Sequence, residues 1–170
     1  MVTRNAKDTA VSMLHHTKNI PPFEFTGDWE QFAELFLAGR VESSCFWEWH
    51  KSWWQQAQVS PDAVLWVRFE DMKSDLPAIA ALVSSYLGLA HTAEELDAVA
   101  ERCGFVAMKK EADNRDADSA AKGEHVKKGH IREGKVGGWQ SIMSQDTVAA
   151  FDARSAALHE DCGLDLSGNQ

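Results

Sequence analysis

The sequence is short of positive charge. It has 17 Lys and Arg residues against 26 Asp and Glu residues, which gives a formal net charge of −9. Proteins that hold nucleic acid present basic stripes, so this balance argues against a nucleic-acid partner. There is also no apolar run long enough for a secretory signal or a membrane span. We therefore expect a cytoplasmic protein that binds neither nucleic acid nor a membrane.

Cysteine is scarce. Cys45, Cys103 and Cys162 are odd in number and widely spaced, which predicts neither a disulfide framework nor a zinc site. His15 and His16 are adjacent, so on a helix they would point to different faces, and no second ligand pair is spaced to join them. We expect no metal site. The common phosphate loop G-x-x-x-x-G-K-[S/T] is missing as well.

What is present is a glycine-rich segment at residues 130–140. Gly134, Gly137 and Gly138 fall within five positions, which lets the backbone come close to a ligand. Arg132 beside them offers a planar, permanently charged group suited to phosphate. The segment could therefore hold an anion, although taken alone such a pattern is more often an ordinary turn.

The hydrophobic pattern predicts many helices and few strands. Residues 63–69 are typical of a buried parallel strand, and residues 1–3 of the end of another. Residues 114–129 are polar and predict a mobile loop. Helices are expected from Asp8, from Asp28 to about Gly39, over about 44–58, from Asp75 to Gly88, from Thr92, over 105–110 as a short turn, and over about 145–161.

Three segments in order change the interpretation of the glycine-rich stretch. They are RNAKDTAVS at residues 4–12, FEDM at 69–72 and REGKVGGWQ at 132–140. They resemble the C-terminal half of the cytosolic sulfotransferase family, where R-N-P/A-K-D-x-x-V-S precedes Y-E-D-M and then R-K-G-x-x-G-D-W-K. The resemblance covers the chain from residue 1 to about residue 165.

The resemblance implies an α/β protein: the C-terminal half of a P-loop-like sulfotransferase fold, with helices around an incomplete parallel sheet. Residues 1–170 would then form a partial sulfotransferase domain. Such enzymes transfer a sulfuryl group from 3′-phosphoadenosine 5′-phosphosulfate (PAPS) to a hydroxyl or amine of a small acceptor, and they release 3′,5′-bisphosphoadenosine. The family's phosphosulfate loop, T-Y-P-K-S-G-T, does not occur in the sequence. Its Lys and the catalytic base His are expected upstream of Met1, so no catalytic residue is assigned.

The resemblance also implies which residues hold the nucleotide. Arg4 and Ser12 match ligands of the 3′-phosphate, and Trp139 is expected to pack the glycine-rich segment down. Some positions depart from the family: Phe69 replaces Tyr, Glu133 replaces Lys, and Cys103-Gly104 replaces Thr-Ser. The complete set of expected nucleotide-binding residues is Arg4, Ser12, Phe69, Phe105, Arg132, Glu133 and Gly134.

Several alternatives stay open at this stage. A second polypeptide that supplies the missing half is an implied partner besides the small acceptor, and the dimer motif of the animal enzymes is absent. The chain alone would be inactive, or it would be a non-catalytic nucleotide-binding or interaction module derived from such an enzyme. A purely helical scaffold would leave the ordered motifs unexplained. The tryptophans of residues 44–58 could face the acceptor or pack in the core, and packing is the more common role.

Overall fold

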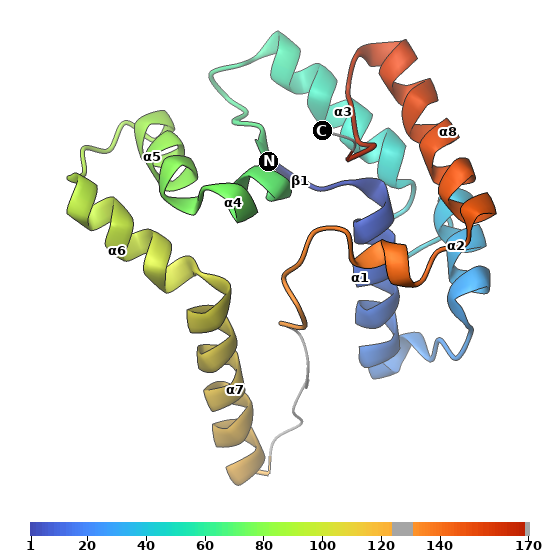
Figure 1. Cartoon of the computed structure of the whole chain (residues 1–170), viewed down its shortest axis with the longest axis horizontal. Coiled ribbons are helices and arrows are strands. Elements are labelled where there is room, and N and C mark those ends of the chain that lie inside the picture. Colours follow the sequence, from blue (N-terminus) through green and yellow to red (C-terminus); the bar gives the residue numbers. More distant parts are fainter. Residues whose placement is uncertain (124–130, 169–170) are drawn as a thin grey trace.

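Helices form most of the chain, and the two short strands lie between two groups of them (Figure 1). The structure is a computed structural model that describes residues 1–123 and 131–168. No helix within these residues is both long and apolar enough to cross a membrane. The elements are β1 (Val2–Thr3), α1 (Ala6–Asn19), η1 (Pro21–Phe23), α2 (Trp29–Leu37), α3 (Phe46–Val59), β2 (Val67–Arg68), α4 (Phe69–Ser74), α5 (Leu76–Tyr86), α6 (Ala93–Cys103), α7 (Phe105–Ala121), η2 (Gly138–Ser141) and α8 (Gln145–Cys162).

The two strands pair in parallel, with Val2 opposite Val67 and Thr3 opposite Arg68. The predicted strand over 63–69 is too long. A turn ends at residue 63, and residue 69 already begins α4. A strand forms where a partner pairs with it, and β1 offers two residues. Because β1 leads into α1 and β2 leads into α4, the carboxyl ends of both strands and the starts of both helices meet at one edge.

The hydrophobic core lies among α1, α2, α3 and α8. Phe36 on α2 lies at its centre, with its ring centroid 5.5 Å from that of Trp47 and 5.6 Å from that of Phe151. The indole of Trp47 donates to Ser155 Oγ at 3.2 Å. Another tryptophan of α3, Trp54, donates to the carbonyl of Cys162 at 3.0 Å. These tryptophans therefore pack α3 onto α8.

Local rules predicted most helix starts correctly. Asp28 caps α2, Asp75 caps α5, and Thr92 forms a capping box with Glu95 at α6. The exception is the first helix, where Asn5 and not Asp8 is the N-cap. The Asn5 side chain accepts from the backbone N–H of Asp8 at 2.8 Å, which leaves the Asp8 carboxylate free for other contacts.

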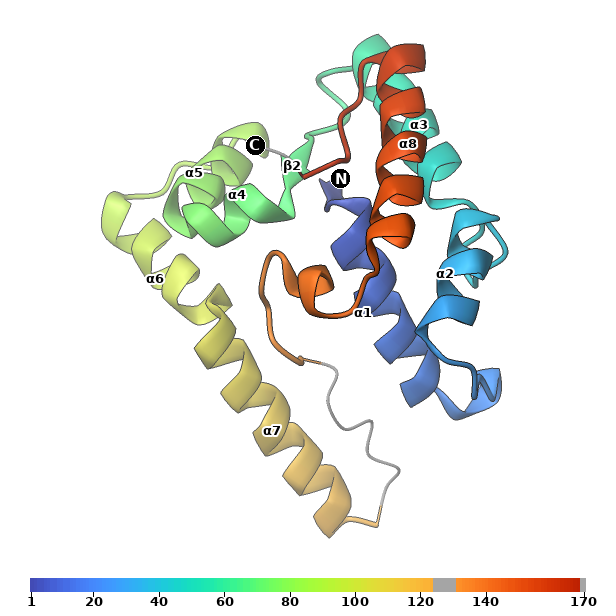
Figure 2. The same cartoon turned by 45° about the vertical axis from the view of Figure 1, so that its right-hand side comes forward.

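Helices α4 to α7 form an arm beside the core helices (Figures 1 and 2). The helical spacing of apolar residues 76–87 predicts that they face inward, but only those of the first turns of α5 are partly buried. Val83, Tyr86 and the capping residue Leu87 are exposed, Leu87 by 60%. Helix α7 has 17 residues, so the predicted short turn and the first part of the predicted loop are wrong. Its polar composition is typical of a loop, but polar residues also suit a helix that projects into solvent. Residues 124–129 of the predicted loop lie outside the described residues.

Candidate functional site

Asn5 and Glu70 join the first two of the three sequence motifs, which are residues 4–12 and residues 69–72. Glu70 lies in the first turn of α4, and its Oε1 accepts from both the backbone N–H and the side-chain amide of Asn5, each at 2.9 Å. The backbone N–H of a helix N-cap has no partner within the helix, so Glu70 supplies one. The Glu of the FEDM motif thus fixes the start of α1 against α4. The sequence alone did not reveal this pair.

Asp8 joins the first motif to the third, residues 132–140, and its side chain is 1% exposed. Its Oδ2 accepts from the backbone N–H of Gly137 at 2.7 Å, and its Oδ1 accepts from that of Trp139 at 3.2 Å. The amide of Asn5 donates to the same carboxylate at 2.9 Å. Gly137 has φ +82°, a value that favours glycine, and this turn aims the two N–H groups at Asp8. The buried carboxylate therefore holds the glycine-rich segment in place.

A second attachment comes from Lys7, whose side chain is 3% exposed. Its ammonium forms an ion pair with Asp152 of α8 and lies 4.7 Å from the ring centroid of Trp139. Trp139 also packs against the hydrophobic core. The expectation that Trp139 packs the glycine-rich segment down agrees with these contacts.

Arg4 reaches both other motifs from the end of β1. Its Nη2 donates to the carbonyl of Lys135 at 2.6 Å, and its guanidinium carbon lies 4.5 Å from the ring centroid of Phe69. Phe69 therefore keeps the aromatic support under the guanidinium without a tyrosine hydroxyl. Burial lowers the pKa of Arg4, and the nearby carboxylates of Asp8 and Glu70 oppose that shift. The side chain stays charged near neutral pH, because the ordinary pKa of arginine is far above it.

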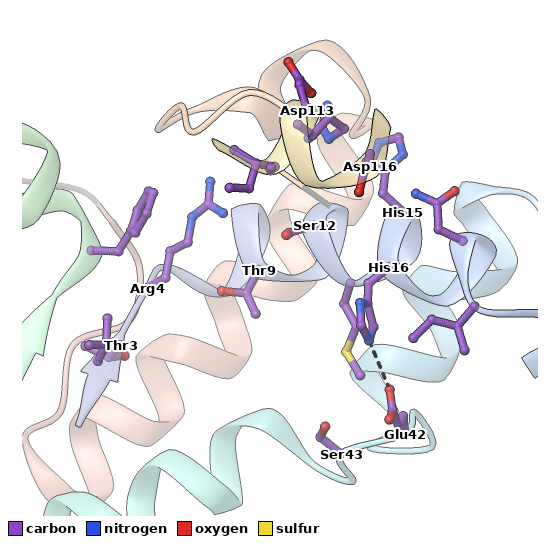
Figure 3. A pocket seen from close by; sticks show the side chains of 18 of the residues that line it. Thr3, Arg4, Thr9, Ser12, His15, His16, Glu42, Ser43, Asp113 and Asp116 are labelled. Carbon is purple, nitrogen blue, oxygen red and sulfur yellow. Dashed lines mark ion pairs between the residues drawn. The ribbon is translucent and has the colours of Figure 1, made fainter. Parts of the chain in front are cut away.

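A cavity of about 880 Å³ opens beside Arg4, between α1 and α7 (Figure 3). This is the size of pockets that hold small ligands and cofactors. Ser12, on the second turn of α1, lies on its wall. The α3 tryptophans Trp47, Trp49, Trp53 and Trp54 do not line it. The expected nucleotide-binding residues that the cavity brings together are Arg4, Ser12, Phe69 and Arg132.

Two histidines of α1 also line the cavity. Burial lowers the pKa of His15, and the positive charge of Arg132 lowers it further. His15 is therefore neutral near pH 7, since its pKa lies below the ordinary value of about 6.5. His16 lies 3.7 Å from the carboxylate of Glu42. The permanent positive charge on the cavity wall comes from its arginines, and the carboxylates of Glu42, Asp113 and Asp116 lie on the same wall.

The remaining expected residues lie next to the cavity and are not part of its wall. Glu133 forms an ion pair with Arg132 and lies 3.9 Å from the ammonium of Lys135. Gly134 has φ +59°, and a Cβ at this position would collide with the ring of Phe105. Glycine is therefore required where the segment crosses Phe105. The carboxylate of Glu133 neutralises the guanidinium of Arg132, which lies in the same motif.

The family model described as "Sulfotransferase domain" matches residues 1–163. The chain belongs to the sulfotransferase family. This sulfotransferase-family chain is 29% identical over 167 residues to sulfotransferase 1A1 of Bos taurus, covering 96% of this chain and 55% of the relative. It is 30% identical over 154 residues to the amine sulfotransferase of Oryctolagus cuniculus, covering 89% of this chain and 50% of that relative. It therefore spans about half the length of the curated relatives it matches.

Solved structures are similar over nearly the whole of this sulfotransferase-family chain. The crystal structure of mouse sulfotransferase SULT7A1 complexed with PAP has a TM-score of 0.78 and 26% identity, covering 95% of this chain and 58% of that one. The crystal structure of retinol dehydratase in complex with androsterone and inactive cofactor PAP has a TM-score of 0.80 at 23% identity. The match covers 96% of this chain and 47% of that one. That likeness concerns the fold alone. The prediction of an α/β sulfotransferase fold, with helices around a small parallel sheet, is confirmed.

Proposed function

We propose that residues 1–170 are the part of a PAPS-dependent sulfotransferase that binds the 3′-phosphate of the nucleotide. The observation that carries this proposal is the convergence of Arg4, Ser12 and Arg132 on one cavity. The complete enzyme would transfer the sulfuryl group of PAPS to a hydroxyl or amine of a small acceptor. Support comes from the relatives, which are named sulfotransferases, and from the mouse structure, which is complexed with PAP.

The available donors fit a phosphate. Arg4 Nε is buried without a hydrogen-bond partner, although Nη2 of the same guanidinium is engaged. Ser12 and Arg132 add a hydroxyl and a second guanidinium to the same cavity. A hydrogen bond to a charged group contributes about 1.5–3 kcal/mol. Phe69 supports Arg4, and Phe105 supports the segment at Gly134, so both are proposed to stabilise the bound nucleotide through these contacts.

Sulfuryl transfer, like phosphoryl transfer, depends mainly on positioning and on neutralising charge. In this proposal PAPS supplies the sulfuryl group, and Arg4, Ser12 and Arg132 hold and orient the nucleotide at its 3′ end. The 170 residues contain no T-Y-P-K-S-G-T loop for the 5′-phosphosulfate. We therefore propose that they form a partial domain, inactive alone, and that a polypeptide segment carrying this loop and a base His completes the site.

The test of this function is ligand preference measured by calorimetry on the 170-residue chain. We expect 3′,5′-bisphosphoadenosine to bind at least about tenfold more tightly than 5′-AMP, because only the former carries the phosphate that the arginines hold. The same preparation should transfer no sulfuryl group from PAPS to a simple phenol. Equal affinity for the two nucleotides would remove the basis of the proposal.

A second candidate is a non-catalytic nucleotide-binding or interaction module derived from the enzyme. The observation that favours it is the ion pair of Glu133 with Arg132, which places a carboxylate where the family has a lysine. Adding a polypeptide with the phosphosulfate loop and base His separates the two candidates. Sulfuryl transfer in the mixture supports the enzyme, whereas nucleotide binding without transfer supports the module.

The Glu133 contact gives a prediction of its own. Glu133→Gln should tighten binding of 3′,5′-bisphosphoadenosine by about two- to fivefold, and Glu133→Lys should tighten it further. The effect is modest because Glu133 is 42% exposed, and exposed ion pairs are worth about 0.2–1 kcal/mol. Calorimetry measures the affinities, and Glu160→Gln on the exposed side of α8 controls for the loss of one negative charge. Unchanged affinity in both Glu133 variants would show that this carboxylate does not oppose the phosphate.

A further inference from the structure

Unpartnered polar atoms gather at the edge where β1 and β2 end. Within the described residues, the buried side-chain atoms without a hydrogen-bond partner are Thr3 Oγ1, Arg4 Nε, Glu70 Oε2 and Trp29 Nε1. The first three belong to adjoining residues at this edge. Thr3 and Arg4 line the cavity, whereas Glu70 does not. A buried donor or acceptor left unpaired destabilises the fold, so such groups call for an explanation.

The hydroxyl of Thr3 makes no hydrogen bond to any of the residues that the structure describes. Thr3 is 4% exposed, and its backbone is held opposite Arg68 in the parallel pair. Valine has the same shape and suits a strand equally well, and it would leave no unpaired hydroxyl. The hydroxyl at this position therefore lowers the stability of the ligand-free chain relative to its isostere.

Arg4 also has a buried donor without a hydrogen-bond partner. Its Nη2 is engaged by the carbonyl of Lys135 and faces Asp8 at 3.5 Å, while its Nε is buried and unpaired. Thr3 ends β1 and Arg4 follows it in the chain, and Figure 3 shows Thr3 at the base of Arg4 beside the cavity. The two unpaired groups are thus a hydroxyl and an N–H, both able to donate. An oxygen with several lone pairs, as in a phosphate, satisfies both.

We infer that Thr3 is a further ligand of the 3′-phosphate, and that its hydroxyl and Arg4 Nε donate to oxygens of that group. The inference rests on the proposed function, since it assigns a residue to the same phosphate. It accounts for the unpaired hydroxyl, which becomes satisfied when the nucleotide binds. Thr3 then contributes to the choice of ligand as well as to affinity, because its hydroxyl contacts the phosphate that 5′-AMP lacks.

The test compares Thr3→Val and Thr3→Ser with the original chain. Calorimetry measures affinity for 3′,5′-bisphosphoadenosine and for 5′-AMP, and thermal unfolding measures stability without ligand. Thr3→Val should bind 3′,5′-bisphosphoadenosine about tenfold more weakly, the effect of one hydrogen bond to a charged group, and should bind 5′-AMP unchanged. Its melting temperature without ligand should be equal or higher. Thr3→Ser keeps the hydroxyl and should retain the affinity to within about threefold.

The outcomes separate the inference from the function on which it rests. If the original chain prefers 3′,5′-bisphosphoadenosine and Thr3→Val binds it equally well, the Thr3 assignment is wrong while the proposed function stands. If Thr3→Val melts lower and loses affinity for both nucleotides alike, the hydroxyl is structural and the assignment is again wrong. If the original chain shows no preference, the proposed function itself fails.

Discussion

Replacing Asp8 with alanine is expected to lower the free energy of unfolding by about 3–5 kcal/mol, the cost of removing a buried charged group from its partners. The Asp8 carboxylate accepts from the backbone N–H groups of Gly137 and Trp139 and from the amide of Asn5. It also lies 3.5 Å from Arg4 Nη2. The substitution leaves these donors without their acceptor, and buried donors without acceptors are costly.

Urea unfolding followed by tryptophan fluorescence measures this loss, with Asp97→Ala as the control. Asp97 is an exposed aspartate on α6, so its replacement should change the free energy of unfolding by no more than about 0.5 kcal/mol. Asp8→Ala should also weaken nucleotide binding in the folded chain, because the segment that carries Arg132 is no longer held. A loss below about 1 kcal/mol would mean that the first and third motifs are not joined through Asp8.

Replacing Arg4 with glutamine is expected to weaken binding of 3′,5′-bisphosphoadenosine by about 100-fold. That factor corresponds to about 2.7 kcal/mol, within the range for losing charge-assisted hydrogen bonds to a phosphate. The guanidinium of Arg4 is fixed from two sides, by the carbonyl of Lys135 and by the ring of Phe69. It is therefore oriented before the ligand arrives, and little rotamer freedom remains to be lost on binding.

Calorimetry measures the Arg4 effect, and two further variants sharpen it. Arg4→Lys keeps the charge but loses the planar group that packs on Phe69, so an intermediate loss is expected. Arg102→Gln on the exposed end of α6 removes one positive charge away from the cavity and should leave the affinity unchanged. An affinity of Arg4→Gln within about threefold of the original would exclude Arg4 from the phosphate site.

Features governed by neighbours in the sequence were predictable. Asp28 caps α2, and Thr92 forms a capping box with Glu95 at α6, both as predicted, because each of these contacts joins residues three positions apart. The length of β2 was not predictable in the same way, because it depends on how much of β1 pairs with it. The α7 helix was missed because its composition satisfies the rules for a polar loop as well as for an exposed helix.

For the candidate site, the resemblance placed Arg4, Ser12, Phe69 and Arg132 in one region, and the structure brings these four together. The contacts that assemble the region were not predicted. Asp8 meets Gly137 across 129 positions of the sequence, and Asn5 meets Glu70 across 65. Local spacing carries no signal for such pairs.

The most direct test of the account is a crystal structure of the 170-residue chain with 3′,5′-bisphosphoadenosine. The account predicts that the 3′-phosphate lies between Arg4 and Arg132, with the hydroxyl of Ser12 within hydrogen-bond distance. It also predicts that the contacts of Asp8 with Gly137 and Trp139 are kept. A nucleotide bound outside this cavity, or one whose 3′-phosphate points away from both arginines, would contradict the assignment of the site.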